Sequence, residues 1–229
     1  MGHVISELTG KTGHHLEKLN NTGPLLHREV IRPFKALQSM AQENGFELSI
    51  ASAYRSFDTQ LSIWNAKARG EKKLLDKDGH PMDYNNLSKT ELLFAILTWS
   101  ALPGFSRHHW GTDIDIFDKN SLPSPDYQIQ LIDDEVKDGG IFGPLHIWLD
   151  KKISTNTAHG FLRPYQKDSK GVMPERWHIS HFPTAKRYIE KLTLQLFSDT
   201  MDAADILLKK EILEHRHIIF DRFITPTNQ

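Results

Sequence analysis

The sequence predicts an α+β domain, and three observations support that class. Stretches with helical spacing of apolar residues alternate irregularly with short strand-like segments, and no regular βαβ rhythm appears. With 229 residues, the chain is long enough to bury a sizeable core in one domain. From about Thr184 onward the sequence becomes almost continuously helical in character. We therefore expect a main domain over residues 1–183 and a C-terminal helical extension over residues 184–229 packed on it.

The composition is that of a globular domain with balanced charge. Hydrophobic residues make up 38% and charged residues 25%, and 28 basic against 29 acidic residues give a formal net charge of -1. This balance gives no electrostatic reason to expect nucleic acid or an anionic membrane as a partner. No stretch approaches the roughly 20 apolar residues of a membrane span. Because the chain has no cysteine, any metal must be bound by histidine and carboxylate.

The first predicted elements are a helix and a strand. Residues 27–45 place Val30, Phe34 and Leu37 on one helical face, Gly45 marks a C-terminal stop, and Pro33 suggests that the regular helix begins near it. In the following "FELSIASAYRS", apolar and polar residues alternate as in a half-buried strand. This strand ends at Arg55, so the arginine is expected at a strand end.

Two helices and a polar loop are expected next. Residues 57–69 look helical, with Leu61 and Trp64 on one face. Residues 70–88 are polar and contain the turn signal "DKDG", which favours a solvated surface loop. Ser88 followed three residues later by Glu91 predicts a capping box at the start of a helix over residues 89–100.

The second half of the main domain contains two further predicted strands. In "DIDIF", Ile114 and Ile116 share one face of a strand, so Asp113 and Asp115 share the other. A helix is expected around residues 140–153, and "RWHISHF" reads as another strand. Apolar residues recur throughout the segment after residue 184, which favours packed helices over a membrane or partner helix.

The segment "SRHHWGTDIDIFD" combines potential zinc ligands with a turn. Either His108 or His109 precedes a carboxylate, Asp115, that a strand would hold rigidly. Gly111 between them would allow the tight turn that brings the ligands together. Imidazole and carboxylate are suitable zinc ligands. This spacing occurs by chance in many proteins, so a charged turn without metal remains the alternative for this segment alone.

The segment "PERWHISHF" supplies the other half of a possible site. Glu175 precedes His178 by three residues, with Trp177 beside the histidine. A hydrolytic zinc site needs three protein ligands, an open position for water and a base. His108, Asp115 and His178 would supply the ligands and leave Glu175 free as the base. The alternative is a Trp-His strand packed in the core with Glu175 solvated before it.

A third segment, "SAYRSFDTQ", adds a cation at the end of a strand. The Arg55 guanidinium can pair with carboxylates through two parallel hydrogen bonds, and Gln60 follows five residues later. A surface arginine in a local salt bridge is the alternative for this residue taken alone.

These three segments, in this order, resemble the zinc D-alanyl-D-alanine carboxypeptidases of the VanY type, which belong to the LAS metallopeptidases. The family patterns are S-G-Y-R-S with a following Gln, then S-x-H-x-x-G-x-A-x-D, then E-x-W-H, against "SAYRSFDTQ", "SRHHWGTDID" and "ERWH" here. "HGFLRPY" also resembles the segment that leads into the last pattern. The resemblance covers residues 26–183. It implies the LAS-type fold shared with Hedgehog: a small antiparallel sheet flanked by helices.

The resemblance also implies roles for the residues in these patterns. Because Ser106 aligns with the serine of the second pattern, His108 is the ligand and His109 only its neighbour. Glu175 is the general base, and Arg55 holds the substrate and stabilises the oxyanion. The implied Zn²⁺ ligands are His108, Asp115 and His178, and the implied substrate contacts are Arg55, Gln60, Ser106 and Trp177.

The chain departs from the VanY-type patterns in three places. Ala53 replaces a common glycine, and "WHISHF" lacks the tyrosine-rich tail usual after the last histidine. Asp113 stands where a small residue is usual, although a related group of LAS murein endopeptidases has Asp-x-Asp there. Since Asp113 shares a strand face with Asp115, it is expected either to orient a ligand or to contact substrate.

Three further histidines are not expected to bind the metal. His181 lies three residues beyond His178, and positions three apart on a strand face opposite sides. His146 and His159 have no potential partner ligand at a recognisable spacing.

The predicted function is hydrolysis of peptidoglycan stem peptides, with D-alanyl-D-alanine carboxypeptidase activity favoured and Glu175 activating a zinc-bound water. The alternatives are a murein endopeptidase or endolysin of the same fold and a catalytically inactive cell-wall-binding domain; the presence of Glu175 argues for activity. The substrate places the protein in the periplasm or another extracytoplasmic space. The N-terminal segment lacks the basic start and apolar run of a signal peptide. The oligomeric state is left open.

Overall fold

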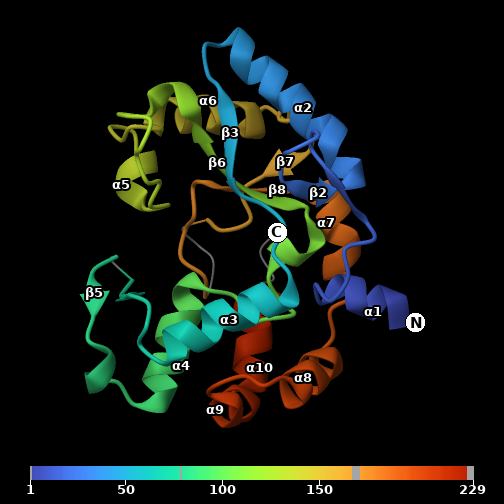
Figure 1. Cartoon of the computed structure of the whole chain (residues 1–229), viewed down its shortest axis with the longest axis vertical. Helices are drawn as coiled ribbons and strands as arrows, with labels where there is room; N and C mark the ends of the chain where they lie inside the picture. The colour runs from blue at the N-terminus through green and yellow to red at the C-terminus, as the bar shows by residue number, and fades with distance from the viewer. Residues whose placement is uncertain (1, 78, 167–170, 226–229) are drawn as a thin grey trace.

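A four-stranded antiparallel sheet forms the centre of the computed structural model, which describes residues 2–77, 79–166 and 171–225. Its strand order is β3-β6-β8-β7. In Figure 1, helices α2 and α6 lie with the sheet in one half of the molecule, and α3 and α4 lie in the other half with the C-terminal helices. This arrangement confirms the predicted α+β class. The bounds are β3 Leu48–Ser52, β6 Asp113–Asp118, β7 Phe161–Leu162, β8 His178–His181, α2 Arg28–Glu43, α3 Phe57–Ala68, α4 Lys89–Trp99 and α6 Gly143–Ser154.

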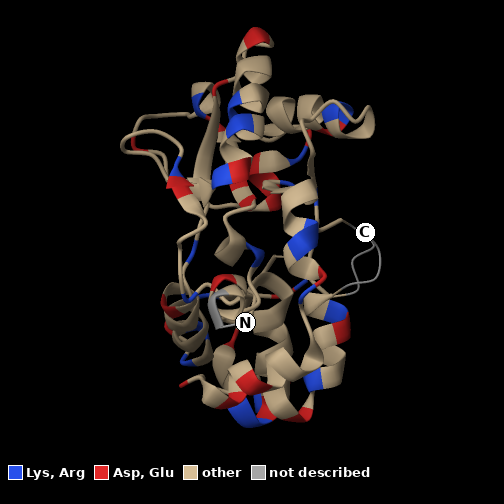
Figure 2. Cartoon of the chain, turned by 90° about the vertical axis from the view of Figure 1, so that its right-hand side faces the viewer, with Lys and Arg blue, Asp and Glu red and all other residues tan. Residues whose placement is uncertain are grey.

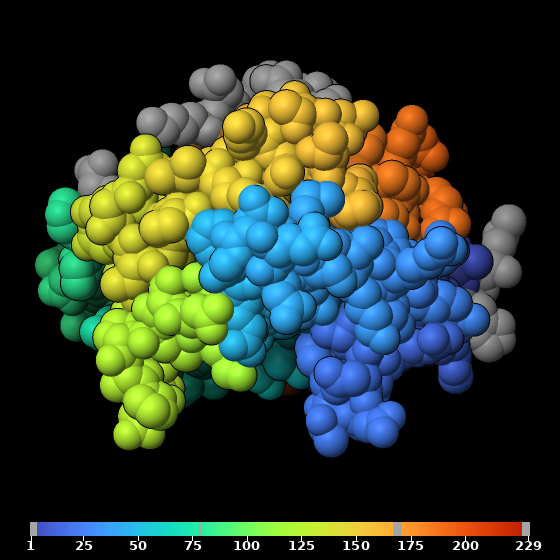
Figure 3. All heavy atoms as spheres, turned by 90° about the horizontal axis from the view of Figure 1, so that it is seen from above, coloured from blue at the N-terminus to red at the C-terminus, as the bar shows by residue number. Residues whose placement is uncertain are grey.

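The sheet separates an apolar core from a polar face. Ile114 and Ile116 of β6 are fully buried in a cluster with Phe34 of α2 and Leu145 of α6. From above, atoms of α2, the α2–β3 turn and the region of α6 cover this side of the molecule (Figure 3). Asp115 points the other way and pairs in register with His178 of β8. The period of two along β6 therefore places its carboxylates together, as predicted.

Helix α2 begins five residues before Pro33, so the predicted start of the regular helix at that proline was wrong. His27 caps the helix, since its Nδ1 accepts a hydrogen bond from the backbone N–H of Glu29 at 3.1 Å. A proline in the second turn removes one backbone hydrogen bond from the helix. The cap and four buried residues on the apolar face hold the first turns in place: Val30, Phe34, Leu37 and Ala41.

Helices α3 and α4 begin at serine caps. The Ser56 hydroxyl accepts a hydrogen bond from the N–H of Thr59 at 3.2 Å. Ser88 and Glu91 form both hydrogen bonds of the predicted capping box. The helices predicted over residues 57–69 and 89–100 are confirmed to within one residue at each end.

Residues 70–77 and 79–88 contain more regular structure than the surface loop that the sequence predicted over residues 70–88. A short hairpin joins β4 (Leu74–Leu75) to β5 (Pro81–Met82), and a 3-10 turn follows at Tyr84–Asn86. Leu74 is buried, and the Tyr84 hydroxyl donates to the carbonyl of Ala68 at 2.8 Å. The few apolar residues within this charged stretch are therefore enough to pack it against α3 and α4.

The C-terminal helices pack on the helical half of the main domain. Phe197, Met201 and Ile212 share one buried cluster with Trp64 of α3 and Ile96 of α4. The first of these helices begins at Phe182, directly after β8 and two residues before the predicted boundary. The elements are α7 Phe182–Ile189, α8 Leu194–Ala203, α9 Lys209–Glu214, α10 Arg216–Ile219 and a π-helical turn at Phe220–Ile224.

The N-terminal segment packs beside the turn that precedes β6. It comprises helix α1 (Gly2–Leu8) and a hairpin of β1 (Leu16–Lys18) with β2 (Leu25–His27). The indole N–H of Trp110 donates to the carbonyl of Leu8 at 2.9 Å.

Basic and acidic residues are interspersed in both halves of the molecule (Figure 2). Within the described ranges, no helix is both long and apolar enough to cross a membrane.

Candidate active site

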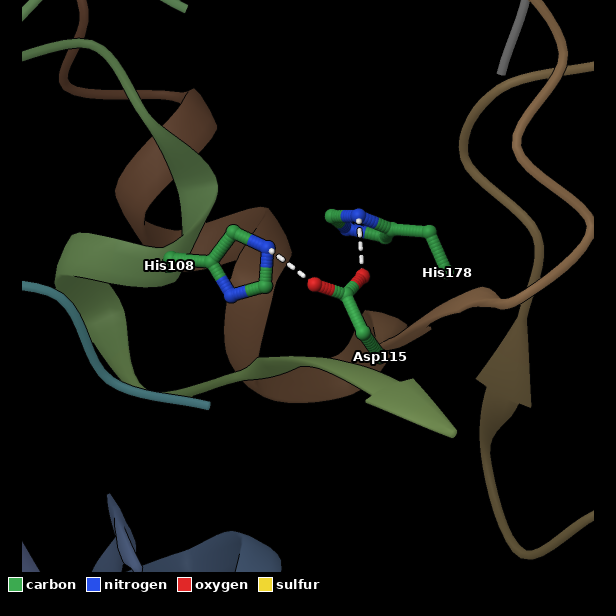
Figure 4. A group of neighbouring side chains, drawn as sticks. All are labelled: His108, Asp115 and His178. Atoms are coloured by element: carbon green, nitrogen blue, oxygen red, sulfur yellow. Dashed lines mark ion pairs between the residues drawn. The ribbon is translucent and has the colours of Figure 1, made fainter. Parts of the chain in front are cut away.

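Three ligand-type side chains converge on the polar side of the sheet. His108 comes from a 3-10 turn at Arg107–Trp110, Asp115 from β6 and His178 from the start of β8. One potential ligand atom from each lies within 4.8 Å of the others, and all three residues are buried. His108 Nε2 is 3.4 Å from Asp115 Oδ2, and His178 Nδ1 is 3.3 Å from Asp115 Oδ1 (Figure 4). The predicted triad is therefore assembled from three separate segments.

The hydrogen bonds of the two histidines show which nitrogens are available to a metal. His108 Nδ1 lies 2.8 Å from the carbonyl oxygen of Ala53, and His178 Nε2 lies 2.9 Å from Asp113 Oδ1. Because both partners are acceptors, these nitrogens donate, which leaves His108 Nε2 and His178 Nδ1, the two nitrogens that face Asp115, as those available to a metal. Asp115 Oδ1 is buried and accepts no hydrogen bond from a described group. This donor set fits a metal cation.

Asp113 holds His178 from behind. Its Oδ1 accepts from Arg107 Nε at 2.7 Å as well as from His178 Nε2, and its Oδ2 accepts from the hydroxyls of Thr112 and Ser180 at 2.6 and 2.9 Å. Burial alone would raise the pKa of Asp113, but Arg107 and His178 hold it well below its usual range. Asp113 is thus an ionised acceptor that orients the imidazole of His178. Of the two roles predicted for it, orienting a ligand or contacting substrate, this contact is the first.

Glu175 lies beside the triad without belonging to it. Its Oε2 is 3.3 Å from His178 Nδ1, and the residue lines the same cavity as the three ligands. Burial raises the pKa of the Glu175 carboxyl, and the nearby Asp115 carboxylate acts in the same direction. A carboxylate with a raised pKa next to a metal-ligand group has the properties of a general acid–base.

The cavity has a volume of about 260 Å³. Four of the predicted site residues line it together with the triad: Arg55, Ser106, Glu175 and Trp177. A volume at or below the lower end of the roughly 300–1,000 Å³ of drug-sized pockets suits the end of a peptide. Other lining residues that the sequence patterns did not indicate include Lys67, Trp99, Leu131 and Tyr165.

Gln60 is the predicted substrate contact that does not line this cavity. It is 1% exposed, accepts from Arg55 Nη1 at 2.8 Å and donates to the carbonyl of Ala101 at 2.7 Å. Arg55 Nη2 also donates to Ser52 Oγ at 3.2 Å. The observed hydrogen bonds therefore make Gln60 a support for Arg55.

Three of the four other histidines considered in the sequence analysis have structural partners. His109 donates from Nδ1 to the carbonyl of Arg55 at 2.6 Å and accepts at Nε2 from the N–H of Gly104 at 2.9 Å, so it fixes the turn beside His108. His181 faces away and contacts Thr184 Oγ1 at 2.9 Å. His146 is buried beside Arg163 at 3.3 Å, and His159 is exposed. None of the four belongs to the ligand group found among the described residues.

Tyr165 is a site residue that the sequence patterns did not single out. Its ring meets that of His178 edge to face at 4.9 Å, and burial raises the pKa of its phenol to about 12. It belongs to "HGFLRPY", so its place just before the last motif was the available signal.

Comparison with known proteins places the chain in a family. Residues 23–184 match the sequence model of the family described as VanY, D-alanyl-D-alanine carboxypeptidase. Two uncharacterised proteins of Haemophilus influenzae are similar: one is 43% identical over 98 residues, covering 42% of this chain and 67% of the relative, and the other is 33% identical over 122 residues, covering 52% and 89%.

Two solved structures share the fold at low sequence identity. VanYB in complex with D-alanine-D-alanine has a TM-score of 0.52 and 22% identity, over 81% of this chain and 88% of that one. A Zn(II) complex of a mutant vancomycin-resistance D,D-pentapeptidase VanY, from a VanB-type cassette, has a TM-score of 0.50 and 21% identity, over 86% and 88%. They match in fold, and the family match covers most of the chain. This chain belongs to the VanY family of D-alanyl-D-alanine carboxypeptidases.

Proposed function

We propose that this protein is a zinc-dependent peptidase that removes the terminal D-alanine from peptidoglycan stem peptides. The observation that carries the proposal is the convergence of His108, Asp115 and His178 in one cavity. Glu175, an acid outside this ligand group, lies beside them. The family match supports peptidase chemistry. The Zn(II) and the D-alanine-D-alanine in two proteins of similar fold support the choice of metal and substrate.

Zn²⁺ would be held by His108 Nε2, Asp115 and His178 Nδ1. When bound at such a site, zinc acts as a Lewis acid that polarises a carbonyl group and makes water more acidic. The protein fixes the ligands in advance, since Ala53 and Asp113 hold the two imidazoles in the orientation and tautomer that the site requires.

Glu175 is the proton carrier of the proposed reaction. Its carboxylate takes a proton from the attacking water and then gives it to the nitrogen of the leaving D-alanine. The raised pKa of the buried carboxyl brings it closer to the pH at which both transfers are efficient.

Arg55 stabilises the negative charge that develops on the scissile carbonyl oxygen. Gln60 and Ser52 hold its guanidinium, so little reorganisation is needed when the charge appears. Ser106 and Trp177 form part of the wall against which the peptide lies. Because peptidoglycan lies outside the cytoplasmic membrane, the proposed place of action is the periplasm or another extracytoplasmic space.

The test is incubation of the zinc-loaded protein with intact muropeptides and measurement of the product masses. We expect pentapeptide stems to lose the mass of one alanine residue. Separation of crosslinked strands would instead make the protein an endopeptidase with the same site. No product over a wide range of protein concentration would contradict the proposal and favour a cell-wall-binding domain.

A further inference from the structure

Lys67 places a second cation in the candidate active-site cavity. It lies on α3 seven residues after Gln60, which is two helical turns, so both side chains point toward the same side of the helix. Lys67 lines the cavity together with Arg55, Ser100 and Glu175. It belongs to none of the three sequence patterns that defined the site.

The ammonium group of Lys67 has a neutral partner. Its Nζ donates to Ser100 Oγ at 2.6 Å. Among the side chains in the described ranges, Lys67 forms no ion pair with a carboxylate. Five other lysines do form one: Lys89, Lys119, Lys137, Lys186 and Lys210. An ammonium group has three protons to donate, so Lys67 retains capacity for an acceptor that enters the cavity.

Its surroundings favour an incoming anion. Burial lowers the pKa of Lys67 to about 8, and the neighbouring charge of Lys72 acts in the same direction. Both effects destabilise the charged amine, and a carboxylate placed beside it would offset them. At pH 7 the amine is still largely protonated, so the positive charge is available for binding.

Lys67 is also better placed for this role than the other charged groups of the cavity. Two of the five N–H donors of Arg55 bond to Gln60 and Ser52, and the proposed reaction directs its remaining donors to the scissile carbonyl oxygen. At the ligand triad, Asp115 and Glu175 would repel a second carboxylate. A negatively charged group of the substrate is therefore directed toward the side of the cavity that Lys67 and Ser100 form.

We propose that Lys67 and Ser100 form a subsite that binds a carboxylate of the substrate peptide and thereby contributes to specificity. The inference rests on the proposed peptidase function, since it names a group of that substrate. The carboxylate is either the C-terminal one or one located within the stem peptide. Both have the same chemistry, and peptides that carry only one of them distinguish the two sources.

The test measures peptide binding by calorimetry to zinc-loaded protein carrying Glu175→Gln, which prevents turnover. The first probe, diacetyl-L-lysyl-D-alanyl-D-alanine, has only a terminal carboxylate; the second is its uncharged C-terminal amide. The third is that amide extended by D-isoglutamate, which has only an internal carboxylate. Each is titrated into the parent, Lys67→Met and Lys67→Arg.

The charged probe that uses the subsite is expected to bind about tenfold or more weakly to Lys67→Met, and Lys67→Arg is expected to restore most of the loss. The uncharged amide should bind all variants alike. Lys73→Met is the matched control, because it removes an exposed charge outside the cavity. Equal binding of both charged probes to parent and Lys67→Met, or no binding to the parent, would overturn the inference.

Two further measurements separate the possible failures. Thermal melting checks that Lys67→Met is folded, and Lys67→Gln replaces it if the melting temperature falls. Carboxylate-dependent binding without hydrolysis by the wild-type protein would contradict the proposed function and leave the subsite in place. Hydrolysis by the wild-type protein, with peptide binding that does not depend on Lys67, would contradict the subsite and leave the proposed function in place.

Discussion

Asp113 of β6 and His178 of β8 are diagonal neighbours across the two strands, with Oδ1 of the carboxylate 2.9 Å from Nε2 of the imidazole. This contact turns the other nitrogen of His178 toward Asp115 and Glu175. It also accounts for an acid at a position where VanY-type sequences usually have a small residue. Arg107 and Ser180 hold Asp113 in place, so the orientation of His178, a candidate metal ligand, depends on a buried charged network.

Replacing Asp113 by asparagine is expected to weaken zinc binding about 10- to 100-fold, because the amide no longer fixes the tautomer and angle of His178. The measurement is a competition titration with a zinc chelator, together with the nitrogen chemical shifts of the His178 ring. Ser180→Ala is the control: it removes one hydrogen bond from Asp113 without touching His178, and should change zinc affinity much less. Unchanged affinity and ring shifts in Asp113→Asn would refute the role.

Gly111 is required at the turn between His108 and Asp115. Its φ is 66°, and an added Cβ would lie 2.6 Å from the backbone nitrogen of His27 and from Leu16 Cδ2. Gly111→Ala is expected to lower the free energy of unfolding by well over 1 kcal/mol in urea denaturation. Gly45→Ala is the matched control, since Gly45 has φ 89° with nothing within 4 Å, and should cost only about 1 kcal/mol. Equal losses would show that the close contacts at Gly111 do not matter.

His27 makes stability depend on pH. Burial lowers the pKa of His27 to about 4, whereas the unfolded chain titrates near 6.5. Between those values the unfolded state binds a proton that the folded state excludes. The contribution of His27 to the free energy of unfolding is therefore complete above pH 6.5 and falls toward pH 4, by up to about 3 kcal/mol. His27→Asn keeps an N-cap acceptor for Glu29 and removes the titration. Urea denaturation at several pH values should show a shallower loss in the variant; parallel curves would exclude His27 as a source.

Much of the site was readable from the sequence because its residues lie in short segments with family-like spacing. The period of two in "DIDIF" placed Asp113 beside Asp115 and the isoleucines in the core, and the serine of the second pattern selected His108 over His109. What could not be read was the long-range pairing of polar groups. The acceptor for His178 and the burial of Gln60 behind Arg55 depend on contacts between segments far apart in the chain.

Two other features escaped prediction for the same reason. The charged segment 70–88 looked solvated because a few apolar side chains are a weak signal, yet Leu74 packs into the helical core and Leu75 lines the cavity. The sequence patterns did not indicate Lys67, which lies in the last turn of α3. Only the fold shows that Lys67 lines the same cavity as His108, Asp115 and His178.

The most direct test of the account compares the rate of D-alanine release by wild-type protein and Glu175→Gln at equal bound zinc, with a pentapeptide stem as substrate. Bound zinc should be about one per chain in both proteins and lost in His178→Ala. We predict release by the wild type and a rate at least 100-fold lower in Glu175→Gln, because the proton carrier is missing. Release at the wild-type rate by the zinc-loaded Glu175→Gln protein would contradict the account.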